Sequence, residues 1–217
     1  MLIAMVLAAT LTGACSLEAP ATDAQAAPLA AAIAHYQKVE TYRVILHSFR
    51  ADGEEHILYY YKKPGYVRME FIKPHSGALL IYNPNTKRVR LWPFGFGHFP
   101  EINLSPGNPL IRSNSGQRVD HSDIGELFEN IRILQQSGKT EVLGEEIMDG
   151  HKVLHFVVTG ADNFTVAGVH RHELWLDTES LFPVKGISRD VHDAILETVV
   201  MDDLEVNITL PDTMFNP

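Results

Sequence analysis

Apolar and polar residues alternate along the stretch of residues 58–94. Val67, Met69 and Phe71 share one face of a strand there, because successive side chains of a strand point to opposite faces. Turn-forming residues interrupt the alternation at short intervals, in Lys63-Pro64-Gly65, Pro74-His75-Ser76-Gly77 and Asn83-Pro84-Asn85. Because Pro and Gly are disfavoured in central strands, the stretch predicts an antiparallel meander of about four strands joined by tight turns.

Strand patterns also flank this meander. Residues 42–50 and 54–62 predict a hairpin that turns at Asp52-Gly53. The last third of the chain predicts six further strands, near residues 140–148, 151–159, 169–177, 182–189, 195–201 and 204–208. The pattern therefore predicts a mainly β (α+β) fold of about ten or eleven antiparallel strands in one large curved sheet.

Two helices are predicted beside the sheet. Pro28 suits the first turn of a helix over residues 28–39, in which apolar residues recur at helical spacing. A second helix starts after Asp123, with Glu126 completing a capping-box pattern, and ends near Gly138. Its apolar residues form a stripe that needs a partner, so we expect both helices to cover the concave face of the sheet. The stripe consists of Ile124, Leu127, Phe128, Ile131 and Leu134.

The segment of residues 93–114 breaks the pattern, because it is rich in proline and glycine and yet carries many large apolar residues. Phe94, Phe96 and Phe99 are three of these. Loops of this length are uncommon unless they are functional. Either the segment caps an open end of the core, or it faces a cargo or a membrane.

Composition and the N-terminus add a cellular context. The chain has 217 residues, a formal net charge of −9 and 45% hydrophobic residues, so one domain with a sizeable core is possible, and no nucleic-acid partner is expected. Residues 1–15 are apolar and uncharged, and they are too few for a transmembrane helix but have the length of a signal peptide. Residues 16–27 are small and polar, which predicts a flexible tether.

The apolar N-terminal run ends in Leu11-Thr12-Gly13-Ala14-Cys15, which resembles a bacterial lipobox. Cys15 is the only cysteine of the chain, and the resemblance implies that acyl chains attached to it anchor the protein in a membrane. Ser16 follows where an Asp would signal retention at the inner membrane, so we expect the outer membrane, with the domain on its periplasmic face.

Candidate catalytic chemistry is sparse. His170 and His172 share a strand face, as do His151 and His155, but no further ligand pair stands at metal-binding spacing. Exposed strand histidines explain them better than a metal site does. The sequence also contains no nucleophile elbow, phosphate-binding loop or dinucleotide fingerprint, so it gives no sign of an enzyme and predicts no cofactor.

Several short motifs resemble the periplasmic outer-membrane lipoprotein carrier and receptor superfamily (LolA/LolB-like). The resemblance covers residues 29–217, and its motifs are structural rather than catalytic. The matching segments are Tyr61-Lys62-Lys63-Pro64-Gly65-Tyr66-Val67-Arg68, Pro74, Leu80-Ile81-Tyr82-Asn83-Pro84, Leu174-Trp175-Leu176-Asp177 and Phe182-Pro183-Val184-Lys185.

The resemblance implies an incomplete β-barrel over residues 28–217, in which helices act as a lid over a hydrophobic cavity that binds acyl chains of lipoproteins or lipids. Lys63 stands where carriers of the family often have an arginine that helps to hold the lid closed, and lysine lacks the planar fork of donors. We expect Phe94, Phe96 and Phe99 to bind cargo or membrane, and four further side chains to line the cavity. These four are Met69, Phe71, Leu80 and Leu91.

Two functions and a third alternative follow. The leading one is delivery of acylated cargo to the outer membrane, with acyl chains, the anchoring membrane and a periplasmic carrier as partners. The second is an envelope-stress signalling module of the same fold, which binds a regulatory protein or a mislocalised lipoprotein. The third is an enzyme that uses the histidines, which stoichiometric zinc in the purified protein would favour.

Overall fold

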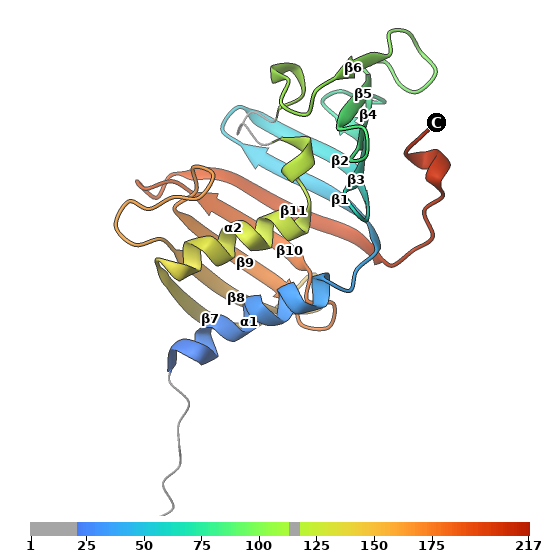
Figure 1. The fold of residues 1–217 in the computed structure, drawn as a ribbon. Coiled ribbons are helices and arrows are strands. Elements are labelled where there is room, and N and C mark those ends of the chain that lie inside the picture. Colours follow the sequence, from blue (N-terminus) through green and yellow to red (C-terminus); the bar gives the residue numbers. More distant parts are fainter. Residues whose placement is uncertain (1–20, 113–117) are drawn as a thin grey trace, which may run out of the picture.

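The computed structural model describes residues 21–112 and 118–217, and a single open antiparallel sheet of eleven strands dominates them (Figure 1). Its strand order is β6-β5-β4-β3-β2-β1-β11-β10-β9-β8-β7, so the meander and the C-terminal strands join where β1 pairs with β11. The mainly β prediction is confirmed. In chain order the strands are β1 (Thr41–Arg50), β2 (Gly53–Lys62), β3 (Tyr66–Lys73), β4 (Leu79–Asn83), β5 (Arg88–Trp92), β6 (Ile102–Leu104), β7 (Lys139–Met148), β8 (His151–Thr159), β9 (Arg171–Asp177), β10 (Pro183–Arg189) and β11 (Ile195–Val206).

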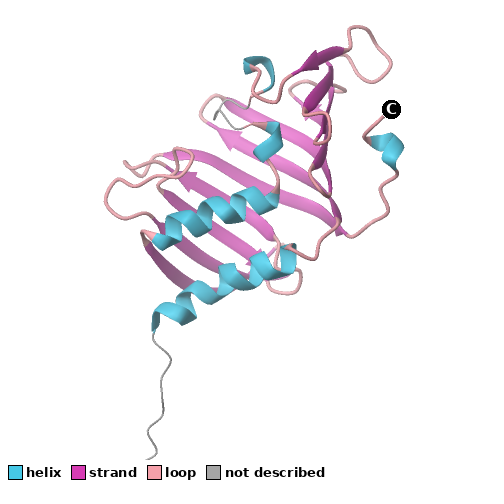
Figure 2. Ribbon diagram, in the orientation of Figure 1, coloured by secondary structure: helices cyan, strands magenta, loops and turns pink. Residues whose placement is uncertain are grey.

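The two helices, α1 (Ala21–Tyr36) and α2 (Ile124–Gln136), lie across the concave face, over the half of the sheet formed by β7 to β11 (Figure 2). This layer arrangement confirms the expected one. Helix α2 begins where the capping pattern predicts, because the Asp123 carboxylate accepts hydrogen bonds from the backbone N–H groups of Gly125 and Glu126. None of the helices in the described part of the chain is long and apolar enough to cross a membrane.

Helix α1 begins at Ala21 rather than at Pro28, so it includes residues 21–27 of the predicted tether. The prediction of a tether is wrong for these residues. They are small, but several are alanines, and alanine is the strongest helix former. The predicted signal peptide, the lipobox with Cys15 and the first part of the tether lie outside the described residues.

The two strands predicted over residues 195–201 and 204–208 are one strand, β11. Asp202 and Asp203 lie between the two predicted strands, but they do not interrupt β11, because a register shift opposite β1 between Arg43 and Ile45 accommodates an extra residue. Asp203 has a φ of 51°, which bends the strand without ending it. A β-bulge therefore replaces the predicted turn.

The predicted irregular segment 93–114 contains two short regular elements that the sequence pattern did not indicate. β6 pairs with β5 at the edge of the sheet, and a 3₁₀ turn, η1 (Pro109–Ile111), follows it. A second 3₁₀ turn, η2 (Val119–His121), leads into α2. The rest of the described part of this segment is irregular, as predicted.

The sheet has a core on each side. The large core lies between the concave face and the helices, and it includes Val67, Leu80 and Val89 from the meander. A small core lies on the convex face, where Leu210 and Phe215 of the C-terminal segment pack against Trp92. A third 3₁₀ turn, η3 (Asp212–Met214), lies within that segment. The C-terminal segment thus covers the outer side of the meander, and the concave side remains available for a ligand.

Candidate functional site: the concave face of the half-barrel

Aromatic side chains fill the space between the sheet and the two helices. The rings of Tyr42 and Tyr61 stack with 5.1 Å between centroids, and Phe182 meets Tyr42 edge-on at 5.8 Å. Tyr36 of α1 and Phe128 of α2 pack edge-on at 6.1 Å. All five side chains are buried. The helix-covered half of the concave face is therefore a packed core while the helices remain in place.

Three tyrosine hydroxyls of this aromatic region contact the segment that starts α2. Tyr36 donates to the Asp123 carboxylate at 2.9 Å, and Tyr42 accepts from the backbone N–H of Ile124 at 3.2 Å. Tyr59 lies 3.1 Å from the hydroxyl of Ser122, which itself donates to the Val119 carbonyl, so Tyr59 donates. We call these three contacts the tyrosine latch, since they join α1, β1 and β2 to the first turn of α2.

The latch hydroxyls remain neutral at physiological pH. Burial raises the pKa of Tyr36, Tyr42 and Tyr59 well above the ordinary value of 10, and the charge of Asp123 adds to the rise in each. Neutral phenols keep the protons that Tyr36 and Tyr59 donate. The latch therefore holds over the whole physiological pH range.

Lys63, which stands in the position of the family's arginine, contacts the end of the other helix. Its ammonium donates to the Gln37 carbonyl at 2.7 Å, immediately after α1, and to the Glu40 carboxylate at 3.0 Å. A cation at this position also interacts favourably with the negative end of the helix dipole. Both helices are thus held at one end: Lys63 holds α1 to the meander, and the tyrosines hold the start of α2 to α1, β1 and β2.

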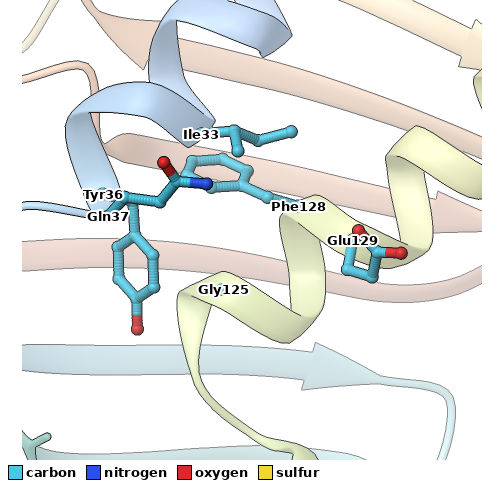
Figure 3. Close-up of a pocket in the computed structure, with 6 residues that line it drawn as sticks. All are labelled: Ile33, Tyr36, Gln37, Gly125, Phe128 and Glu129. Carbon is cyan, nitrogen blue, oxygen red and sulfur yellow. The ribbon is translucent and has the colours of Figure 1, made fainter.

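A hollow of about 210 Å³ lies between α1 and α2 (Figure 3). Ile33, Tyr36 and Gln37 line it from α1, and Gly125, Phe128 and Glu129 line it from α2. Gly125 is required at this crossing, because a Cβ there would lie 2.5 Å from the Tyr36 ring. The hollow is smaller than the usual 300–1,000 Å³ of a ligand pocket, so a long acyl chain fits under the helices only after they move apart.

Beyond the helices, the concave face of the meander is apolar and only partly covered. Leu80 is buried, and Met69, Phe71 and Leu91 are half-buried against the large core. The strand pairing places all four on this face, because Met69 lies opposite Leu80 and Leu80 opposite Leu91. The structure thus brings together the four residues that the sequence analysis assigned to the cavity lining.

We call Met69, Phe71, Leu80 and Leu91 the apolar floor. The three phenylalanines of the β5–β6 segment lie apart from it. Phe94, Phe96 and Phe99 are 69%, 56% and 91% exposed. Phe96 packs edge-on against Trp92 at 5.6 Å, whereas Phe99 extends into solvent. These three side chains therefore do not cap the core, whereas Leu104 and Ile111 of the same segment pack against it. We call the three phenylalanines the phenylalanine loop.

The histidines are dispersed over the sheet. His172 is buried on the concave face beside the Ser188 hydroxyl, so the expectation of exposed strand histidines is wrong for this residue. Burial lowers its pKa to about 4. On the convex face, Nε2 of His155 lies 3.0 Å from the Glu173 carboxylate. Nδ1 of His151 lies 3.3 Å from the Asp177 carboxylate. Among the described residues, no group of three or more His, Cys, Asp or Glu side chains is placed to hold a metal ion.

Sequence reasoning did not identify the tyrosine latch. The alternation of Tyr59 and Tyr61 signals one buried face of β2, and Tyr42 is the second residue of β1. These signals place the rings in the core but do not show where their hydroxyls point. Tyr36 and Asp123 are 87 residues apart in the sequence, so only the fold brings them into contact.

No protein-family model and no curated protein matches this sequence, but solved structures share its fold. An uncharacterized conserved protein from Thermus thermophilus covers 88% of this chain and 93% of its own length at 12% identity, with a TM-score of 0.55. The lipoprotein LppX of Mycobacterium tuberculosis covers 87% of this chain and 97% of its own length at 8% identity, with a TM-score of 0.51.

A Pseudomonas aeruginosa MucA/MucB complex also contains a similar chain. This match covers 89% of the present chain and 60% of the other at 14% identity, with a TM-score of 0.51. Identities this low show a shared fold and leave function to be argued from the site. Together with the open eleven-stranded sheet and its two covering helices, these likenesses show that the chain has the LolA/LolB-like fold that its sequence motifs predicted.

Proposed function

We propose that this protein binds acyl chains of lipoproteins or lipids on its concave face and delivers them to the outer membrane, where acylated Cys15 anchors it. One observation carries the proposal. Met69 and Phe71 of β3 and Leu91 of β5 belong to the apolar floor, whereas the two helices lie over β7 to β11 and leave β3 and β5 uncovered (Figure 1). Half-buried apolar side chains on a concave face are suited to flexible hydrocarbon.

The tyrosine latch and the hollow between the helices support entry of a chain beneath α2. The buried cluster fills the covered half at rest, so an acyl chain that moves beyond the floor has to displace α2 from the sheet. The latch gives this displacement a definite free energy. The lid role implied by the family resemblance therefore has a physical basis in this chain, with tyrosines in addition to Lys63 as the holding groups.

Two charge substitutions on the same strand test the proposal. Met69→Glu places a carboxylate on the concave floor of β3, and Ile72→Glu places one at an exposed position near the end of β3 that is not on that floor. We expect Met69→Glu to abolish binding of a fluorescent fatty acid and Ile72→Glu to leave it unchanged. Equal binding by both variants would show that the floor is not the site.

The signalling module remains the second candidate, because the fold likeness includes a chain of the MucA/MucB complex. Under this alternative the concave face is filled permanently, and a regulatory protein is the ligand. A chain that takes up no fatty acid but is captured by a membrane-bound regulatory protein of the same envelope would favour it. Fatty-acid uptake that Met69→Glu abolishes would favour delivery.

A further inference from the structure

The loops of the half-barrel differ between its two ends. Because neighbouring strands are antiparallel, the connections β1–β2, β3–β4, β5–β6, β8–β9 and β10–β11 all emerge at one end, which we call the loop end (Figure 1). The phenylalanine loop belongs to it. Four more apolar side chains are exposed at this end in the half of the sheet formed by β7 to β11. They are Phe164 in the β8–β9 connection, and Val191, Ile195 and Leu196 in or beside the β10–β11 turn. We call these four residues the hairpin cluster.

The opposite end lacks such a cluster in the described residues. At that end, Ile147 is the exposed large apolar side chain beside a turn, and it lies next to Asp149-Gly150 between β7 and β8. The other connections at that end carry Lys63, Asn85 and Glu179. Apolar exposure is therefore concentrated at the loop end, and soluble proteins rarely expose such concentrations without a binding partner.

The hairpin cluster is held on ordered backbone. The Asp190 carboxylate accepts hydrogen bonds from the N–H groups of His192 and Ala194, both at 2.9 Å, and Arg189 donates to the Asp193 carbonyl at 3.0 Å. In the neighbouring loop, His170 contacts the Phe164 carbonyl through Nδ1 at 2.9 Å. These bonds fix the turns, so the exposed side chains are presented outward without a large entropic cost of ordering on binding.

The arrangement favours a lipid surface as the occupant. The apolar side chains lie on separate loops at both sides of the concave floor, and a protein partner would need a matching pocket for each of them. A bilayer accepts apolar side chains at any spacing, provided that they face the same surface. Arg171 and Arg189 pair with Asp193 at this end, and the net charge of the chain is −9, so no excess of positive charge attracts anionic lipid and insertion of apolar groups has to supply the affinity.

We propose that the hairpin cluster is a second membrane-docking element, which together with the phenylalanine loop seats the loop end of the half-barrel on a lipid bilayer. The inference deepens the proposed function, because docking at both sides of the floor directs the open end of the floor toward the bilayer. Cargo chains then pass between floor and bilayer without crossing water. Docking on one side alone would leave the β8–β11 side of that path open to solvent.

The test uses the chain from Ser16 onward, so that neither an acylated anchor nor the apolar residues 1–15 cause binding, and neutral phosphatidylcholine vesicles as the probe. In this background, Ile195→Ser combined with Leu196→Ser removes half of the hairpin cluster, and Ile147→Ser removes a residue that is 71% exposed at the opposite end. We expect the double variant to bind vesicles about tenfold more weakly or worse, and the Ile147→Ser control to bind unchanged. Phe164→Ser, on a different loop, answers the same question if the double variant fails to fold.

Fatty-acid binding in solution is measured on the same variants. Retained fatty-acid binding with lost vesicle binding supports the inference. Unchanged vesicle binding by both the double variant and Phe164→Ser overturns the inference, and so does no vesicle binding by the parent. A photo-crosslink from position 164 to a protein rather than to lipid also overturns it. A parent protein that binds vesicles but no fatty acid refutes the proposed function and leaves this inference standing, because vesicle docking does not require a bound chain.

Discussion

The tyrosine latch makes one prediction that can be worked out from the structure. Tyr42→Phe removes one oxygen atom from a packed ring and leaves the backbone N–H of Ile124 without its acceptor. That N–H is buried at the first turn of α2, where Asp123 already caps the next two N–H groups. An unsatisfied buried donor costs about 1–3 kcal/mol.

This cost falls on the closed position of α2, because water satisfies the N–H once the helix has moved away. At about 2 kcal/mol, the fraction of molecules with α2 displaced rises roughly 30-fold. The variant is therefore expected to be less stable and yet to bind acyl chains more tightly. Lower stability combined with tighter acyl-chain binding distinguishes a latch from an ordinary packing contact, whose loss would weaken both.

Two assays check the prediction: amide hydrogen exchange along α2, and displacement of a fluorescent fatty acid. Tyr66→Phe is the matched control, since its hydroxyl contacts the exposed Asn85 side chain and not α2. Faster exchange in α2 with unchanged exchange in β1 and β2 is the expected result. Equal loss of protection in helix and strands, or weaker fatty-acid binding, would refute the reasoning.

Three further outcomes follow from burial and charge. His172 has a pKa near 6.5 in the unfolded state and about 4 in the folded state, so the unfolded state binds more protons between these two pH values. The free energy of unfolding should therefore fall by roughly 3 kcal/mol as the pH drops through this window, and His172→Gln should reduce that pH dependence in urea titrations. Leu80→Ala, at a buried position, should cost about 3 kcal/mol in the same titrations, and a cost below 1 kcal/mol would contradict tight packing there. Phe99→Asp should change stability by less than about 0.5 kcal/mol and slow transfer of a fluorescent fatty acid to vesicles, whereas an unfolded Phe99→Asp variant would show that the loop belongs to the core.

The strands of the meander could be predicted because their physical cause is local. Val67, Met69 and Phe71 alternate with polar residues, and this period fixes both the strand and its buried face. β6 could not be predicted in the same way, since three residues among prolines and glycines give no measurable period. The same limit applies to β11, because Asp202-Asp203 resembles a turn in the sequence and only the register with β1 shows a bulge.

The site residues likewise divide into those that a local pattern predicts and those that depend on the fold. The four floor residues follow from strand alternation, and the exposed phenylalanines follow from a segment without regular structure. The latch depends on hydroxyl directions between residues distant in the sequence, such as Tyr42 and Ile124. The hairpin cluster depends on which loops share an end of the sheet, which requires the strand order. Long-range placement is thus the information that the pattern of residues lacks.

Native mass spectrometry tests the central claim most directly. The chain from Ser16 onward, exported behind a cleavable signal peptide, retains α1, which a truncation at Ala27 would cut, and it carries no anchor chain that could be mistaken for cargo. Purified from a periplasm, it should appear with a lipid or an acylated peptide bound, and Met69→Glu should remove that added mass. A mass without ligand that stays unchanged after addition of fatty acid would contradict acyl-chain binding and favour the signalling module.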